Sequence, residues 1–312
     1  MHVLDRFDAE KIRAFHERGE FFWLDLESPS PDELEDLAGI VGLPPLAVED
    51  TRESNQRAKV DDYGDRLLMV FYGFEGPAGH ARMLEVHLHL SGRELITVHW
   101  GPCPPLAGTR SERLHSEPEI VYRVLDALSE SALDLMRRAE GNVVALEQRA
   151  FEHPRQDERR LITRWRGNLF RLMQVIIAER DMLAVNAAAI ERVLGMEPGA
   201  AHNRLSDVRD DLVQAANLAA YCREVLGEAL TVYLQTTSNR LNVIATRLTL
   251  LATIFVPLTL ITSFFGQNFG WLVDHIQSLE SFVILGIGGM VVPTVVIYAW
   301  LRRSGYLNSD GQ

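Results

Sequence analysis

The sequence predicts a small α/β domain followed by long helices and a C-terminal pair of membrane-spanning helices. Charge is the first observation: 40 of the 43 acidic and 28 of the 31 basic residues precede residue 241, and the remainder carries three of each. The second is a pair of long apolar runs within that remainder. The third is the composition between about residues 120 and 240, which is rich in Ala, Leu, Arg and Glu and therefore typical of helices.

Composition excludes several functional classes. A net charge of −12 argues against a nucleic-acid partner, which normally requires a basic surplus, and 47% hydrophobic residues are ample for a packed core. The two cysteines, Cys103 and Cys222, give neither a disulfide framework nor a metal-type spacing. The chain has no Gly-rich phosphate loop and no recognisable Ser/His/Asp motif. We therefore expect no enzyme activity and no organic cofactor.

Residues 1–118 are predicted to form the α/β domain. Ser30, Pro31 and Glu33 mark a helix start, with serine as N-cap, proline at the first helical position and glutamate able to complete a capping box. Around it lie apolar and β-branched runs bounded by glycine-containing turns, which are typical of strands. These runs are Phe21–Leu26, Leu67–Phe74, Met83–Leu90 and Glu94–Trp100.

Residues 119–247 are predicted to form long helices. Two stretches, Ile120–Glu152 and Asp157–Leu194, are separated by a break near His153 and Pro154. A third begins around Asn203 and continues into the first apolar run. At 1.5 Å per residue, roughly 60 helical residues span on the order of 90 Å. A helix of that length must bury its apolar stripe against neighbouring helices or copies of itself.

Residues 248–303 are predicted to cross a membrane twice. The runs Leu248–Phe265 and Phe282–Leu301 are each close to the 20 or so apolar residues that a bilayer core requires. Basic residues precede the first run and follow the second, whereas the connecting loop 266–281 carries two acidic residues and no basic one. The positive-inside rule then places both termini, including the tail 304–312, in the cytoplasm. The predicted location is the inner (plasma) membrane, with the lipid bilayer as a partner.

One face of the first run is small or polar. Its members recur at spacings of three and four, so that they share one side of a helix. They are Asn242, Ala245, Thr249, Ala252, Val256, Thr259 and Ser263. Small residues of this kind favour either close helix packing in the membrane or, in an oligomer, the lining of an axial channel. The two interpretations are compatible.

The first run ends in Gly266, Gln267 and Asn268. Glycine lets the chain leave the helix, and the two amides offer neutral oxygens. A ring of such oxygens suits a hard cation that retains its water, as Mg²⁺ does. Taken by itself, a Gly-x-Asn sequence is more often a turn.

The stretch SNRLNVIATRLTLLATIFVPLTLITSFFGQN, followed by a second span and a basic tail, resembles the CorA divalent-cation transporters. The resemblance extends upstream to FFWLDL and to GLPPLAVEDTRESNQRAKVDDY, and so covers nearly the whole chain. It implies a homopentamer that passes Mg²⁺, and also Co²⁺ or Ni²⁺, into the cytoplasm down its electrochemical gradient. The family signature is Gly-Met-Asn, and Gln267 replaces the methionine, which leaves the ion preference open.

The resemblance also implies a regulatory Mg²⁺ site between neighbouring subunits that holds the pore closed. The family carboxylates for this site match Glu49, Asp50, Asp126 and Asp207. Two alternatives to a Mg²⁺ transporter remain for the function of the whole chain. They are a Zn²⁺ transporter of the related ZntB type and a membrane-tethered coiled-coil sensor. His87 and His89 share one face of a predicted strand and His99 lies on the next, so the three could bind Zn²⁺. No acid or cysteine accompanies them at ligand spacing, and we therefore expect exposed strand histidines.

Overall fold

The computed structural model describes residues 2–110, 117–152, 156–197, 199–267, 270–275 and 278–303. The chain divides into two compact units, Met1–Tyr233 and Leu234–Gln312. Helix α7, Ala200–Phe265, contributes residues to both.

The first unit is built on a six-stranded mixed sheet with the order β1-β2-β6-β5-β4-β3. Strands β1, β2 and β6 are parallel, and the remaining pairs are antiparallel. The strands are β1 His2–Leu4, β2 Phe22–Glu27, β3 Lys59–Asp62, β4 Arg66–Glu75, β5 Arg82–Ser91 and β6 Glu94–His99. The four predicted strands are thus confirmed, and the two short edge strands β1 and β3 were not predicted.

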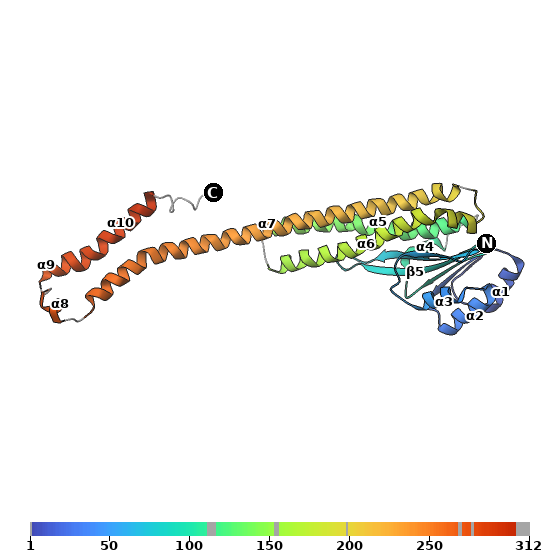
Figure 1. Ribbon diagram of the computed structural model, residues 1–312, viewed down its shortest axis with the longest axis horizontal. Coiled ribbons are helices and arrows are strands. Elements are labelled where there is room, and N and C mark those ends of the chain that lie inside the picture. The colour runs from blue at the N-terminus through green and yellow to red at the C-terminus, as the bar shows by residue number, and fades with distance from the viewer. Residues whose placement is uncertain are drawn as a thin grey trace. The chain divides into compact units, whose positions relative to one another are not determined.

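Helices cover both faces of the sheet (Figure 1). Along β2, Phe22 and Leu24 pack with α1–α3, whereas Trp23 belongs to the core formed with the long helices. Coverage on both sides explains why this strand is almost continuously apolar. The first-layer helices are α1 Ala9–Arg18, α2 Pro31–Val41 and α3 Pro45–Arg52; the opposite face carries α4 Pro104–Thr109, α5 Glu117–Glu152 and α6 Gln156–Val193, and a short 3₁₀ turn, η1, spans Ala78–His80.

The predicted helix start at Ser30 is confirmed in detail. The Ser30 hydroxyl accepts a hydrogen bond from the Glu33 backbone N–H at 3.2 Å, and the Glu33 carboxylate accepts one from the Ser30 N–H at 2.8 Å. Pro31 occupies the first helical position, and Gly42 ends the helix with a φ of 71°. This cap and the left-handed glycine fix both ends of α2.

Side chains of the long helices α5 and α6 accept hydrogen bonds from the part of β4 that β3 does not pair with. Strand β3 pairs only as far as Val70, so the β4 backbone beyond it has no strand partner on that side. There the Glu179 carboxyl of α6 accepts a hydrogen bond from the Tyr72 N–H at 2.6 Å, and the Ser131 hydroxyl of α5 accepts one from the Phe74 N–H at 2.9 Å. These contacts satisfy edge donors that would otherwise be buried unpaired.

Glu179 gives a test of this attachment. Burial raises the pKa of this carboxyl well above its ordinary value of 4.5, so the neutral acid is the folded form. Its contribution to stability is therefore complete below that ordinary value and is lost as pH rises through the raised pKa. Glu179→Gln keeps an oxygen acceptor for Tyr72 and cannot ionise, so thermal unfolding of the variant in detergent should lose the stability decrease that the wild type shows as pH rises above 4.5, the ordinary pKa of a glutamate.

Glu179→Leu supplies the contrast. It leaves the buried Tyr72 N–H without an acceptor, which costs about 1–3 kcal/mol of unfolding free energy. An equal pH dependence in the wild type and the glutamine variant would contradict the proposed role of Glu179.

The second unit contains the end of α7 and the second apolar run. That run forms α9 Leu279–Ser281, a π-helical segment η2 Phe282–Gly288 and α10 Gly289–Arg303, and a short helix α8, Gly270–His275, lies in the connecting segment. Within the described residues, two helical stretches, Arg204–Phe265 and Leu279–Arg303, contain windows long and apolar enough to cross a membrane. Neither window is buried in the chain, as the core helix of a soluble protein would be. Both helices continue through their prolines, Pro257 and Pro293.

Candidate functional site

One side of α7 in the second unit is half-buried and mostly bulky, although other bulky side chains of α7, such as Leu248, Phe255 and Leu260, are exposed. The half-buried residues follow one another at spacings of one, three and four, which places them on a single helical face. Ile261 marks what covers it, because its Cγ2 atom would lie 3.9 Å from a Cβ placed on Gly289 at the start of α10. The half-buried residues are Leu250, Thr253, Ile254, Pro257, Leu258, Ile261 and Phe265.

The small face of α7 lies on the opposite side and is exposed. Thr259 is two residues from Ile261, a rotation of about 200° around a helix of 3.6 residues per turn. The structure thus brings the predicted set to one uncovered face of α7. The exposed residues are Asn242, Ala245, Thr249, Ala252, Val256, Thr259 and Ser263.

The threonine hydroxyls on this face have their protons occupied. Thr249 donates to the Ala245 carbonyl at 2.9 Å, and Thr259 donates to the Phe255 carbonyl at 2.8 Å. A hydroxyl that donates to the backbone keeps its oxygen lone pairs as acceptors. Water bound to a cation presents hydrogens outward, so these oxygens are suited to a hydrated ion.

Towards Arg240 and Arg303 the small face meets a hollow within the same unit. Asn242, Ala245 and Thr249 line it together with residues of α7 and α10. These three residues therefore stand at the border between the uncovered face and the side that faces the second span. Ala252, Val256, Thr259 and Ser263 have no part in the hollow.

The end of α7 agrees with the predicted helix exit at Gly266. The Gly266 N–H donates to the Thr262 carbonyl at 2.9 Å, and the Gln267 N–H donates to the Phe264 carbonyl at 3.3 Å. A Cβ at Gly266 would lie 3.1 Å from the Thr262 carbonyl oxygen, so a side chain would crowd this last turn. Gln267 is exposed, and Asn268 lies outside the described residues.

Two of the four predicted regulatory carboxylates interact within the first unit. Asp126 of α5 and Asp207 of α7 are near enough for electrostatic repulsion. Burial raises the pKa of Asp126 and the Asp207 charge adds to that increase, while Arg123, whose Nη1 lies 3.5 Å from the Asp126 carboxylate, opposes it.

The same acidic cluster contains two members that were not predicted. Burial raises the pKa of Asp211, and the charges of Asp126, Glu130 and Asp207 raise it further. Glu130 and Asp211 follow Asp126 and Asp207 by four residues each, so that spacing was the signal in the sequence. Asp126, Glu130, Asp207 and Asp211 are called the acidic cluster below.

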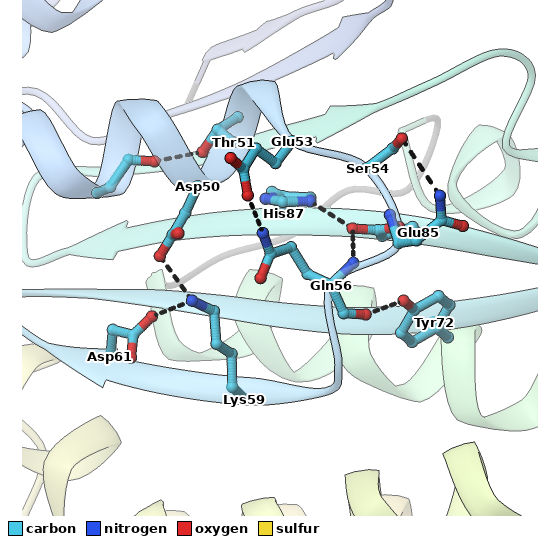
Figure 2. A network of polar contacts seen from close by, with 12 residues as sticks. Asp50, Thr51, Glu53, Ser54, Gln56, Lys59, Asp61, Tyr72, Glu85 and His87 are labelled. Carbon is cyan, nitrogen blue, oxygen red and sulfur yellow. Dashed lines mark hydrogen bonds and ion pairs between the residues drawn. The ribbon is translucent and has the colours of Figure 1, made fainter.

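Glu49 and Asp50 lie on α3, which packs on the other face of the sheet. The Asp50 carboxylate is 2.6 Å from Lys59 Nζ, which is also 2.8 Å from Asp61 (Figure 2). Burial alone would lower the pKa of Lys59, but these two carboxylates raise it above its ordinary value. Glu49 is exposed. In one chain, therefore, the sheet separates Glu49 and Asp50 from Asp126 and Asp207.

The expected exposed state of the strand histidines is wrong. His87, His89 and His99 are at most 2% exposed, because both sheet faces are covered. His89 Nε2 lies 2.9 Å from the Thr51 hydroxyl, and burial lowers its pKa to about 3. His99 pairs with Val86 rather than with His87, so it points to the opposite sheet face and forms an ion pair with Asp25. The three do not form a zinc site, and no group of three metal-ligating side chains converges within the described part of this chain.

Comparisons with known proteins agree with these features. The family described as CorA-like Mg²⁺ transporter protein matches residues 18–303. A Bacillus subtilis protein, YfjQ, described as a candidate metal ion transporter, is 26% identical over 92% of this chain and 90% of its own length. The cobalt/magnesium transport protein CorA of Thermotoga maritima is 22% identical over 93% of this chain and 85% of its own.

Solved structures show the same fold. The complete CorA magnesium transporter of Methanocaldococcus jannaschii superposes with a TM-score of 0.78 at 21% identity, covering 91% of this chain and 90% of that one. The shared features are the mixed α/β unit, the long helix and the C-terminal apolar helix pair. With the family match extending over most of its length, the chain belongs to the family of CorA-like Mg²⁺ transporter proteins.

Proposed function

We propose that several identical chains, five by the family resemblance, surround a water-filled axis and pass Mg²⁺, with Co²⁺ and Ni²⁺ as further substrates, into the cytoplasm. The observation that carries this proposal is the division of α7 into two sides. The stripe from Leu250 to Phe265 is half-buried, with Ile261 beside Gly289 of the second span, whereas the small face is exposed together with bulky neighbours such as Leu248 and Leu260. The hydroxyl oxygens of Thr249 and Thr259 on this face suit a hydrated divalent ion.

The direction of transport follows from the charge of the substrate. The membrane potential contributes about 2.3 kcal/mol per elementary charge per 100 mV, and a divalent ion carries two charges. We place both termini in the cytoplasm of an inner-membrane protein because Arg240, Arg247, Arg302 and Arg303 flank the span pair, while Asp274 and Glu280 lie in the loop between the spans.

We further propose that cytoplasmic Mg²⁺ closes the pathway by bridging neighbouring subunits. Glu49 and Asp50 of one chain would face Asp126 and Asp207 of the next, because the sheet keeps the two pairs apart within one chain. No three metal ligands converge within the described part of one chain, so a divalent cation that relieves the repulsion in the acidic cluster would need further ligands from the neighbouring subunit. Mg²⁺ bound only in the assembled arrangement would stabilise that arrangement over an open one. Asp50 contributes least, since Lys59 already neutralises it.

Uptake by the reconstituted protein tests the proposal. Proteoliposomes that contain the purified chain are expected to take up Mg²⁺ in response to an inside-negative potential, and Asn268→Ala should abolish that uptake while the oligomer stays intact. Zn²⁺, Co²⁺ and Ni²⁺ measured at the same potential settle the ion preference that Gln267 leaves open. Absence of flux for every ion would favour the membrane-tethered sensor instead, and full uptake by Asn268→Ala would show that the Asn268 amide is not needed in the pathway.

A further inference from the structure

A hollow lies between the two spans near their arginine-bearing ends. Its volume is about 420 Å³, well beyond the roughly 30 Å³ that one water occupies in the liquid. Besides Asn242, Ala245 and Thr249, its lining includes Thr246, Leu250 and Thr253 of α7 and Trp300 and Leu301 of α10. It is open rather than enclosed and lies wholly in the second unit.

The walls of this hollow are more apolar than their residue names suggest. The Thr246 hydroxyl donates to the Asn242 carbonyl at 2.9 Å, and the Thr253 hydroxyl donates to the Thr249 carbonyl at 2.8 Å. Because both hydroxyl protons are satisfied within α7, the threonine methyl groups can adjoin hydrocarbon without leaving a donor unpaired. Leucines and an exposed tryptophan complete a surface that accommodates an acyl chain.

The ends of the two spans beside the hollow are strongly basic. Arg247 follows the lining residue Thr246 in sequence, and Arg302 and Arg303 follow Leu301. The sequence has no acidic residue between Glu228 and Asp274, nor between Glu280 and Asp310. Arg302 and Arg303 therefore have no acidic residue near them in the sequence of the second span.

We propose that this hollow binds an anionic diacyl phospholipid, with an acyl chain between α7 and α10 and the headgroup phosphate on Arg302 and Arg303. Basic pockets between membrane helices at the cytoplasmic surface are the setting in which anionic headgroups bind. Trp300 lies where an indole spans the boundary between acyl chain and headgroup. Because Asn242, Ala245 and Thr249 border both this hollow and the small face, the bound lipid contacts the back of the proposed ion pathway.

Binding of phosphatidylglycerol and phosphatidylcholine with identical acyl chains to the detergent-purified full chain tests the proposal. Native mass spectrometry counts the lipids retained and the subunits present. Each arginine near an anionic headgroup raises the affinity about fivefold. With Arg302 and Arg303 together, phosphatidylglycerol should bind at least about 20-fold more tightly than phosphatidylcholine. R302Q/R303Q should remove that preference, and R302K/R303K, which keeps the charge, should retain most of it. Thr246→Phe, which fills the hollow, should weaken binding of both lipids.

Matched controls separate this site from general charge effects. R159Q/R160Q removes two exposed arginines from α6 in the first unit and should leave the lipid preference unchanged. Inorganic phosphate should not displace the lipid, and displacement would overturn the proposal in favour of a free-phosphate site. Equal binding of the two lipids to wild type, or a preference that survives R302Q/R303Q, would also overturn it.

Occupation of the hollow by a second copy of the chain is the competing outcome. In that case Thr246→Phe would lower the number of subunits in the mass spectrum without changing the lipid count, and the lipid proposal would fail. The measurement involves no ion flux, so its result is independent of whether the transport experiment succeeds.

Discussion

Replacing Ala252 by phenylalanine is expected to reduce divalent-cation flux by at least about tenfold, a rise of ~1.4 kcal/mol or more in the barrier to permeation. Ala252 is exposed on the small face of α7, opposite the stripe that adjoins α10. Copies of this face around one axis would place a ring of aromatic side chains where the wild type has methyl groups. The measurement is Mg²⁺ uptake into proteoliposomes at a fixed membrane potential.

Leu251→Phe is the matched control, one residue away on the same helix. Leu251 is 55% exposed but is rotated by about 100° from Ala252, away from the small face. The control places the same aromatic ring in the same turn but outside the small face, so it shows whether an exposed ring at this level of α7 is by itself enough to reduce flux. Unchanged flux in Ala252→Phe, or an equal loss in both variants, would show that this face of α7 does not line the pathway.

The sequence was most informative where one local rule decides the structure. The capping box at Ser30 and Glu33 forms as predicted because its two hydrogen bonds connect residues only three apart. The central strands were predictable because their continuous apolar character follows from burial on both faces. The three long helices likewise begin and end within a few residues of the predicted limits.

The predictions failed where distant partners decide the outcome. Strands β1 and β3 are three and four residues long, and β3 contains Asp61 and Asp62, so their assignment depends on pairing with β2 and β4. The buried state of His89 depends on Thr51, 38 residues earlier, and Glu179 finds its partner in Tyr72, 107 residues away. The two members of each pair lie too far apart in the sequence for a local pattern to predict their contact.

The candidate site shows the same division. Helical spacing was enough to place Ala252 and Thr259 on one face of α7, because periodicity is a local property. The ion pair between Asp50 and Lys59 was not predicted, although only nine residues separate them, because it requires the turn that brings β3 back beside α3. Whether Glu49 and Asp207 share an ion depends on a second chain, which one sequence does not describe.

Asp207→Asn is expected to weaken closure by cytoplasmic Mg²⁺, raising the concentration for half-maximal protection against protease by about tenfold or more, or ~1.4 kcal/mol of binding free energy. Asp207 repels Asp126 and Asp211, and burial together with this repulsion raises the pKa values of both. Carboxyls with raised pKa values contribute stability that is complete below their ordinary value of 3.8 and is lost as pH rises through the folded value. When no cation is bound, repulsion among these carboxylates therefore opposes folding increasingly as pH rises.

Removing one charge then has opposite effects with and without the ion. In the presence of a chelator, Asp207→Asn should raise the thermal midpoint because the remaining carboxylates repel each other less. In excess Mg²⁺ the variant should gain less stability than wild type, since one ligand charge is missing. Asp181→Asn, an exposed change on α6 beside Arg180, is the matched control and should leave both midpoints and the protease protection unaltered.

The higher thermal midpoint in chelator and the smaller gain in Mg²⁺ together distinguish a metal-binding role of Asp207 from a merely structural one. A structural aspartate would lower the midpoint in chelator when replaced, and a bystander would change neither midpoint. Lowering the pH towards the raised pKa values of Asp126 and Asp211 protonates the same carboxylates in the wild type, and should therefore reduce Mg²⁺ protection in the same direction as the substitution. Mg²⁺ protection that is insensitive both to this pH change and to Asp207→Asn would place the regulatory ion elsewhere in the assembly.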